Sequence, residues 1–540
     1  MKNKLVYKIF ILLPVLLCIN SCNRDDSLLD NPNTRSEESL IPPTLILNHI
    51  TSNLIKSEEM PFNQAARTSQ FYVSNYSYYW GANSYSWTTT DDEYDIYLYA
   101  QKMSEQAQKL GDDTRFNFYK ALSNFFKAYS SIWLSQRVGD IPMKEAGNSS
   151  NLTPNYDTQK EVYKQSLDLL EEANTLLGKI NTTFPNLKNT VADQTGDIFG
   201  LTYFQWQKLI NTYELRILIS LSKRATDTPD LNIPARFAEI LTNTAQYPIM
   251  QSNNDNMLYK FNRDYNPYPI YTRRSYTYGA NIGKTLLDIT TSTKDPRTFI
   301  FATPAPAKYK VAGVSISDFS AYVGASTNTA QSVLFAATDT SGNTVSDKGN
   351  YSYINYKRYF SSQDGSTAEP YIVIGYPELC FNIAEAINRG WVAGDAASWY
   401  SKGINASLSF YGLTNGQSFE IGDRLGGTIG TVTINTDQFL NNSEVIYKGN
   451  NSEGLKQIIL QKYVSLFCNS GYEAFYNWRR TGFPEFQQGG VGIGTPNNQL
   501  PYRWMYPQGE ITYNASHYQS AIQSQYEGSD DISKLMWLLK

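Results

Sequence analysis

Apolar residues recur at three- and four-residue steps through three long segments in the first half of the chain, the pattern of amphipathic helices. These segments are 119–136, 159–180 and 204–225. Asp157 is placed to cap the second helix, because a short acidic side chain accepts hydrogen bonds from the first free backbone amides. The third helix carries basic residues in its predicted last turn, where they complement the helix dipole.

The same spacing returns in the second half of the chain and predicts four more helices: 377–391, 396–412, 453–467 and 473–482. Gly390 and Gly412 are placed to end the first two, since glycine readily adopts the left-handed conformation that closes a helix. Short connections predict antiparallel pairs. Paired helices at both ends of the chain indicate a tetratricopeptide-like stack, although no clean repeat of about 34 residues is present.

Between 226 and 365 this periodicity weakens, and Asn, Asp, Tyr, Thr and Gly become frequent. A segment of this length is too long for one loop in a compact domain, so we expect it to fold as a lobe with short strands, such as 333–338. The sequence therefore predicts a mainly all-α protein. Its helical scaffold spans 41–225 and 370–540, and an irregular lobe, 226–369, is inserted between them.

The N-terminus has the pattern of an export signal. Three lysines precede an apolar run of about a dozen residues, which is too short to span a bilayer as a stable helix. The run ends at Ser21-Cys22, which is similar to a bacterial lipobox, whereas Leu17 before Cys18 fits the cleavage preference poorly. We predict a signal peptide at 1–21, lipidation of Cys22 and a polar tether at 22–40. Ordinary secretion, with loss of Cys22, is the alternative.

Charge and cysteine content narrow the class of protein. The net charge is −4 and no basic patch follows the N-terminus, which disfavours nucleic-acid binding. Apart from Cys18 and Cys22, the chain contains Cys380 and Cys468. An extracellular setting permits one disulfide between them, but their apolar helical contexts are equally typical of two buried thiols.

No pattern of catalytic or metal-binding residues is evident. The two histidines, His49 and His517, belong to no HExxH motif and no Cys/His cluster, and G-x-S-x-G is absent. The Gly-rich segment 489–498 lacks the Lys-Ser/Thr of a phosphate-binding loop and is typical of a flexible turn. The acidic cluster 91–95 precedes a helix, so capping is favoured over catalysis or calcium binding. We expect no enzyme, metal or cofactor.

Six short motifs follow one another between about 137 and 514. They are Arg137-Val138-Gly139-Asp140-Ile141-Pro142 with Glu145-Ala146; Trp206 with Asn211 and Leu215-Arg216; Asp295-Pro296-Arg297; Pro377-Glu378 with Ala384-Glu385-Ala386 and Arg389-Gly390; Gln461-Lys462-Tyr463 with Glu473-Ala474 and Trp478-Arg479-Arg480-Thr481-Gly482-Phe483-Pro484; and Pro501-Tyr502-Arg503 with Tyr506-Pro507, Glu510 and Asn514. In this order they resemble SusD/RagB-type outer-membrane lipoproteins, in the SusD-like subgroup distinct from starch-binding SusD. Met143 and Glu214 depart from the family's usual residues.

The resemblance implies one SusD-like domain over 41–540, built as a tetratricopeptide-like scaffold with an irregular lobe. It implies a protein of the cell outer membrane that faces the extracellular side and captures oligosaccharides or oligopeptides. It also implies a partner, a SusC-like TonB-dependent transporter over which the protein closes as a lid. The motifs are mostly scaffold positions, so we expect Arg479 and Arg480 to join helices through carboxylates. A surface glycoside hydrolase or peptidase with unrecognised catalytic residues is the alternative, and a purely structural lipoprotein is a third possibility.

Two aromatic stretches, 76–87 and 262–279, are candidates for ligand binding, because aromatic rings stack on sugar rings and also serve peptides. In the first stretch Tyr76, Tyr79 and Trp80 share a helical stripe, as core residues would, which leaves the role of Trp80 open. The charged, Pro-rich context of the second favours a surface loop. The predicted ligand-binding residues are Tyr78, Trp80, Tyr85, Trp87, Tyr268 and Tyr271.

Overall fold

The computed structural model describes residues 40–74, 87–262, 264, 266–269, 280–329, 334, 349–359, 369–489, 495 and 497–540. The chain divides into Met1–Pro42 and Pro43–Lys540, and every helix and strand described below belongs to the second unit. The helices of the first half are α2 (Pro43–Asn53), α3 (Gln64–Thr68), α4 (Tyr94–Gln108), α5 (Asp113–Val138), α6 (Gln159–Thr183), α7 (Tyr203–Ser220) and α8 (Ile233–Thr242). The predicted all-α class is confirmed.

The later helices are shorter on average and are interleaved with short strands. They are α10 (Lys284–Ser292), α11 (Arg297–Phe301), α13 (Tyr356–Tyr359), α14 (Tyr376–Asn388), α15 (Ala396–Phe410), α16 (Thr436–Leu440), α17 (Ser452–Ser465), α18 (Glu473–Thr481), α19 (Gln508–Tyr513) and α20 (Ala515–Tyr526). The strands are β1 (Tyr72–Ser74), β2 (Met257–Tyr259), β3 (Ala280–Ile282), β4 (Tyr371–Ile374), β5 (Ser418–Gly422) and β6 (Thr428–Thr433).

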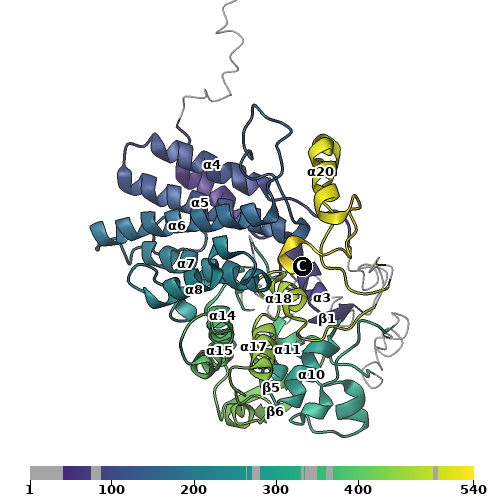
Figure 1. The fold of residues 1–540 in the computed structure, drawn as a ribbon. Coiled ribbons are helices and arrows are strands. Elements are labelled where there is room, and N and C mark those ends of the chain that lie inside the picture. The colour runs from purple at the N-terminus through teal and green to yellow at the C-terminus, as the bar shows by residue number, and fades with distance from the viewer. Residues whose placement is uncertain are drawn as a thin grey trace, which may run out of the picture. The chain divides into compact units, whose positions relative to one another are not determined.

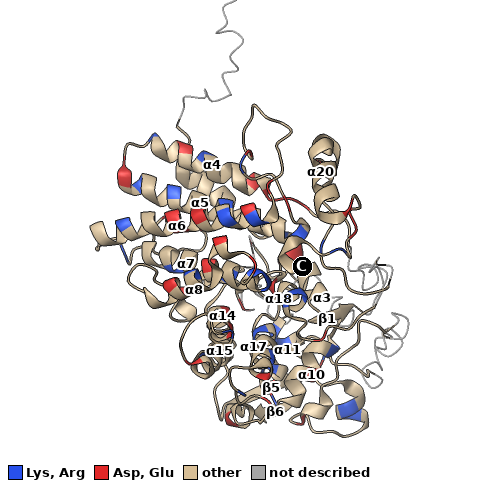
Figure 2. Cartoon of the chain, viewed as in Figure 1, with Lys and Arg blue, Asp and Glu red and all other residues tan. Residues whose placement is uncertain are grey.

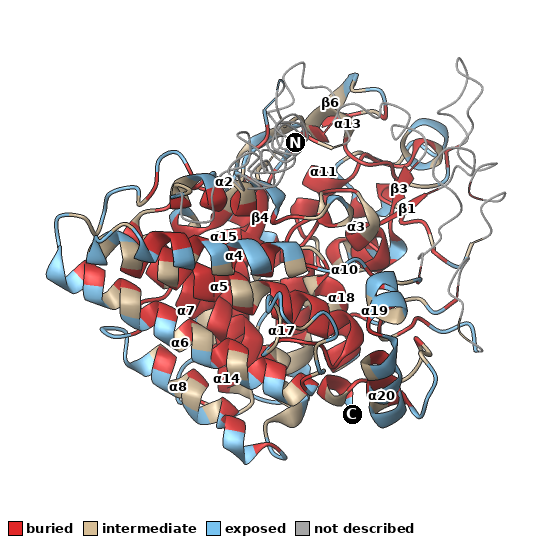
Figure 3. Ribbon diagram, turned by 90° about the horizontal axis from the view of Figure 1, so that it is seen from above, coloured by how far each residue is buried: buried red, intermediate tan, exposed pale blue. Residues whose placement is uncertain are grey.

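The helices form a stack in which neighbours in sequence are neighbours in space (Figure 1). Helix α5 packs between α4 and α6, α7 packs on α6 and α8, and α14 packs on α7, α15 and α17. Figure 3 shows that buried residues line the sides where these helices face one another, while the outer sides are exposed. Burial of one apolar face per helix is what the periodicity predicted, and it confirms the helix-pair scaffold.

The start of α6 differs from the prediction. Its N-cap is Thr158, whose hydroxyl accepts a hydrogen bond from the Glu161 amide (3.3 Å), and the Glu161 carboxylate accepts one from the Thr158 amide (3.0 Å). The predicted cap, Asp157, instead accepts hydrogen bonds from the amides of Met143 and Lys144 (3.0 and 2.8 Å). The assignment of Asp157 was therefore wrong, because the reciprocal capping box holds the helix end and frees Asp157 to hold the preceding turn.

We expect Thr158→Ala to lower the free energy of unfolding by about 1 kcal/mol, because an N3 amide loses its side-chain acceptor. Urea denaturation followed by circular dichroism measures the change. Thr182→Ala is the matched control, since Thr182 lies exposed near the other end of the same helix and bonds only to preceding carbonyls. Equal stability of the two variants would contradict the cap assignment.

Helix α7 ends earlier than predicted. It stops at Ser220, and Lys223 and Arg224 lie in the following 3-10 turn, Ser222–Arg224. The basic residues are thus not in the last turn of α7. They donate instead to carbonyls near the C-terminus, Lys223 to Leu539 (3.0 Å) and Arg224 to Trp537 (3.0 Å). The prediction of a dipole-complementing turn was wrong because these tertiary contacts determine where the basic side chains point.

The helix ends predicted at Gly390 and Gly412 are confirmed, and both glycines have left-handed φ angles of 75° and 72°. Cys380 and Cys468 are free and buried, which settles the open question of a disulfide in favour of two thiols. Burial raises the pKa of Cys380 to about 12, so this thiol stays protonated and unreactive. Within the described ranges, no helix has both the length and the apolarity required to cross a bilayer.

The strands form three antiparallel pairs: β1 with β3, β2 with β4, and β5 with β6. The third pair is a local hairpin, whereas the first two connect distant parts of the chain. The first two pairs link residues 226–369 to the helical segments on both sides of it in sequence. The division of the chain into a scaffold and a separate lobe stays a prediction. The strand expected at 333–338 lies outside the described residues, apart from Leu334.

Candidate functional site

The pairing of β1 with β3 brings together the described residues that flank the two aromatic stretches singled out by the sequence. Ser74 ends β1, Ala280 begins β3, and the two residues are cross-strand partners. Such partners lie about 5 Å apart. The stretch 76–87 follows Ser74 and the stretch 262–279 precedes Ala280, so both connect to the described fold at the same end of one strand pair.

Hydrogen bonds of the Gln70 and Gln487 side chains hold the segments next to this strand pair together. The side-chain oxygen of Gln70 accepts from the hydroxyl of Thr285 (2.7 Å) and from the amide of Gln487 (3.0 Å). The side-chain oxygen of Gln487 in turn accepts from the amide of Thr327 (3.1 Å). The backbones of Gly283 and Gln70 are in close contact here. A Cβ at position 283 would lie 2.0 Å from the carbonyl oxygen of Gln70, and glycine avoids this clash because it has no Cβ. Four separate segments are thus held together beside the candidate site.

Trp87, at the end of the first aromatic stretch, lies in the core. Only 6 % of its surface is exposed, and its ring centroid lies 4.7 Å from that of Trp504 and 5.3 Å from that of Phe475. The rings of Trp504 and Phe475 lie against the Trp87 ring, where a sugar would have to stack. Trp87 is therefore a packing residue in this structure, and its assignment to a ligand-binding face does not fit its position.

Tyr268, in the second stretch, is buried in the same manner. Its ring is 3 % exposed and lies 5.0 Å from Phe261 and 6.1 Å from the stacked ring of Tyr359. Burial raises the pKa of Tyr268 well above that of a free phenol. The charged, Pro-rich sequence context suggested a surface loop, but Tyr359 and Phe62, two of the rings that surround Tyr268, come from distant segments, which local composition does not reveal.

The other predicted site residues lie outside the described residues: Tyr78, Trp80, Tyr85, Tyr271 and the lipidation site Cys22. Most of the Gly-rich segment 489–498 lies outside them as well. The ligand-binding and lipid-anchoring assignments of these residues stay predictions.

The acidic cluster before α4 has a structural role that is only partly the predicted one. The Asp92 carboxylate accepts a hydrogen bond from the amide of Tyr94 (3.2 Å), as a capping residue does. Glu93 makes no side-chain cap bond and instead pairs with the ammonium group of Lys56 (3.2 Å). Burial raises the pKa of Glu93 to about 9, and the charge of Lys56 only partly offsets this effect. No group of three or more potential metal ligands occurs among the described residues.

Arg137, the arginine of the first motif, is fully buried and bonds to other parts of the scaffold. Its guanidinium group donates to Glu58 (2.6 Å) and Glu59 (3.1 Å) and lies 3.3 Å over the ring of Trp133. Burial raises the pKa of Glu59 to about 7, although the charge of Arg137 opposes this. Arg137 thereby joins the end of α5 to the segment between α2 and α3, and it is not directed at a ligand.

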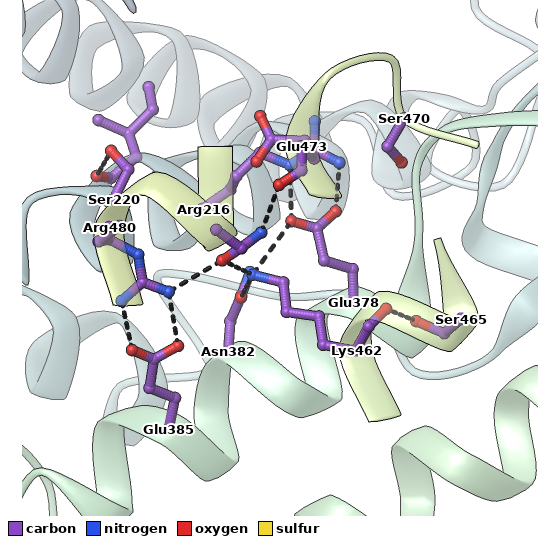
Figure 4. A network of polar contacts seen from close by, with 12 residues as sticks. Arg216, Ser220, Glu378, Asn382, Glu385, Lys462, Ser465, Ser470, Glu473 and Arg480 are labelled. Carbon is purple, nitrogen blue, oxygen red and sulfur yellow. Dashed lines mark hydrogen bonds and ion pairs between the residues drawn. The ribbon is translucent and has the colours of Figure 1, made fainter. Parts of the chain in front are cut away.

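A buried network of ion pairs joins four helices (Figure 4). On α7, Arg216 donates to the Glu378 carboxylate of α14, with one bond of 3.0 Å. Arg480 of α18 makes a two-point pair with Glu385 of α14, one bond of which is 2.8 Å. Lys462 of α17 donates to two asparagine side chains (2.6 and 2.9 Å). The charged groups named here all bond to partners in the scaffold, so this cluster holds helices together.

The two adjacent motif arginines differ in their partners. The expectation for Arg480 is confirmed by its carboxylate partner. Arg479 instead donates to the backbone carbonyls of Gln136 (2.6 Å) and Tyr502 (2.8 Å), so the expectation of a carboxylate was wrong for this residue. Both serve the scaffold, because a guanidinium group can bond to two acceptors at once whether these are carboxylate or carbonyl oxygens.

A family model described as "Starch-binding associating with outer membrane" matches residues 32–507. The chain belongs to this family, the SusD-like proteins. Solved structures agree: SusD homologues from Bacteroides fragilis share 29 % and 30 % identity, with TM-scores of 0.77 and 0.74. The matches cover 93 % of this chain and 100 % and 99 % of theirs. None of the curated proteins matches the chain.

A chitin-binding SusD homologue from Flavobacterium johnsoniae is more distant. It shares 20 % identity with this SusD-like chain and has a TM-score of 0.64, with 92 % of this chain and 97 % of that chain covered. At that identity the match concerns the fold alone. The fold predicted from the motif order is thus confirmed, and the buried motif residues explain how it is held.

Proposed function

We propose that this SusD-like protein is a cell-surface lipoprotein, anchored through Cys22, that captures oligosaccharides or oligopeptides. It delivers them to a SusC-like TonB-dependent transporter of the outer membrane and closes over that transporter as a lid. Family membership over residues 32–507 is the observation that carries the proposal. The lipobox at Cys22 supports the lipid anchor.

The proposed ligand site lies where the two aromatic stretches connect to the β1–β3 pair. The cross-strand pairing of Ser74 with Ala280 supports this place, because residues adjacent to paired strand ends are close together whatever their separation in sequence. A sugar presents C–H groups on its faces and hydroxyls at its edge, so rings of Tyr and Trp beside Asn and Ser suit it. Peptides suit the same groups, and catalysis is not part of the proposal.

Purification of the lipidated protein from outer membranes tests the partner. We expect a large TonB-dependent barrel to be recovered with it in detergent. Cys22→Ser is the control that should reach neither the membrane nor the barrel. Failure to recover any such barrel with the lipidated protein would refute the transporter role.

We expect Trp80→Ala to weaken binding about tenfold, or ~1.4 kcal/mol, because an aromatic ring that stacks on the ligand is lost. Calorimetry with the glycan or peptide found in a ligand screen measures this. Tyr513→Ala is the control, since Tyr513 is 79 % exposed and lies outside both stretches. Unchanged affinity for Trp80→Ala would move the site to 262–279, where Tyr271→Ala is the next variant.

A further inference from the structure

A surface groove runs between α4, α5 and the turn 144–149. Its main hollow has a volume of about 700 Å³. A second hollow of about 360 Å³ adjoins it and shares Tyr97, Lys127 and Lys144 as lining residues. The main hollow lies within the range of about 300–1,000 Å³ that is usual for ligand sites.

The groove contains cationic groups without carboxylate partners. Lys120 and Lys127 project from α5, and neither makes an ion pair in the described part of the chain. Lys127 lies 5.1 Å over the ring of Tyr97, which holds its ammonium group where the two hollows meet. Burial and the charge of Lys120 lower the pKa of Lys127, and the charges of Glu172 and Glu105 offset this effect only in part.

The carboxylates near the groove are occupied by other partners. Glu105 pairs with Lys102 (3.4 Å), and Glu172 accepts a hydrogen bond from Asn124 (2.8 Å). Figure 2 shows acidic and basic residues interspersed along α4, α5 and α6, as on an ordinary solvated surface. The main hollow of the groove is lined by three lysines and one carboxylate, and the adjoining hollow adds Asp168 and Glu172. Lys144 pairs with Asp157 (3.3 Å) and Asp168 pairs with Lys164 (2.9 Å), so Lys120 and Lys127 are the groove lysines that make no ion pair in the described part of the chain.

The remaining lining groups suit a sugar. Amide and hydroxyl side chains of α4, α5 and the turn surround the lysines, and the half-buried ring of Phe116 offers an apolar face. They are Gln101, Ser104, Gln108, Ser123, Asn148 and Ser149. The turn lies close to α4, since a Cβ on Gly147 would lie 2.5 Å from the side-chain oxygen of Gln101.

We infer that this groove binds a carboxylate-bearing oligosaccharide, a short chain of uronic acid residues, with Lys120 and Lys127 contacting its carboxylates. Ammonium–carboxylate hydrogen bonds are about twice as strong as neutral ones, and the amides and hydroxyls bond to sugar hydroxyls. The inference rests on the proposed capture function and specifies an acidic class of ligand. The groove is distinct from the aromatic stretches at the β1–β3 pair.

Calorimetry with oligogalacturonate tests the inference on the full-length mature protein. We expect binding that weakens with salt, is lost with the carboxyl-reduced oligomer, and falls about tenfold in Lys127→Met. Lys127→Arg should retain affinity, and Lys120→Met with Lys127→Met should abolish it. Lys179→Met is the control, since Lys179 is exposed on α6 and lies outside the groove. Thermal unfolding establishes that each variant is folded.

Three results would overturn the inference: equal affinity for the acidic and the carboxyl-reduced oligomers, equal loss in Lys127→Met and Lys179→Met, or tighter binding of a poly-glutamate peptide than of oligogalacturonate. The last would assign the groove to acidic peptides. Recovery of the transporter barrel and binding of neutral glycans test the proposed function separately, and either can succeed when oligogalacturonate fails.

Discussion

Glu385→Gln lowers the free energy of unfolding by about 3–5 kcal/mol, because the substitution leaves the guanidinium group of Arg480 buried without its anion. Both residues are at least nine-tenths buried, and their two-point pair joins α14 to α18. Chemical denaturation compares the variant with Glu444→Gln as control. Glu444 forms an exposed pair with Lys448, and such pairs contribute less than about 1 kcal/mol.

The pH dependence of stability tests the same ion pair. The positive charge of Arg480 overcomes the effect of burial and lowers the pKa of Glu385 to about 2, from an ordinary 4.5. A carboxylate whose pKa falls on folding stabilises the protein fully above its unfolded pKa, and the stabilisation is lost as pH falls toward the folded value. The wild type should therefore lose stability between pH 4.5 and 2 more steeply than Glu385→Gln. Parallel curves for the wild type and Glu385→Gln would contradict this role.

Trp87→Ala is expected to destabilise the protein by about 3–5 kcal/mol and to leave ligand affinity per folded molecule unchanged. The ring fills a core site against Trp504 and Phe475, so its removal leaves a cavity. Denaturant unfolding and calorimetry measure the two quantities on the same preparation. Trp87→Phe, which keeps an aromatic ring, should lose less stability.

The opposite result would restore the ligand-binding assignment of Trp87. A variant as stable as the wild type, with weakened binding, requires an exposed ring that contacts the ligand. The same experiment therefore separates the packing role that the structure gives Trp87 from the binding role that its sequence context suggested.

Local physical signals explain which features could be predicted. The periods of three and four residues located α5, α6, α7, α14, α15, α17 and α18, because helix burial follows spacing along the chain. The incorrect helix predictions concerned the residues at helix ends. Thr158 caps α6 in place of Asp157, and α7 stops before Lys223, since several nearby residues can satisfy a helix end and tertiary contacts decide among them.

The amino-acid sequence by itself determined the helical class, the order of the motifs and hence the SusD-like family. These depend on residues near one another in the chain. Only the tertiary structure decided that Ser74 and Ala280 are partners, that Trp87 and Tyr268 are core residues, and that Arg479 bonds to carbonyl groups. The reason is that strand pairing and the burial of a ring depend on segments far apart in sequence, which periodicity and composition do not specify.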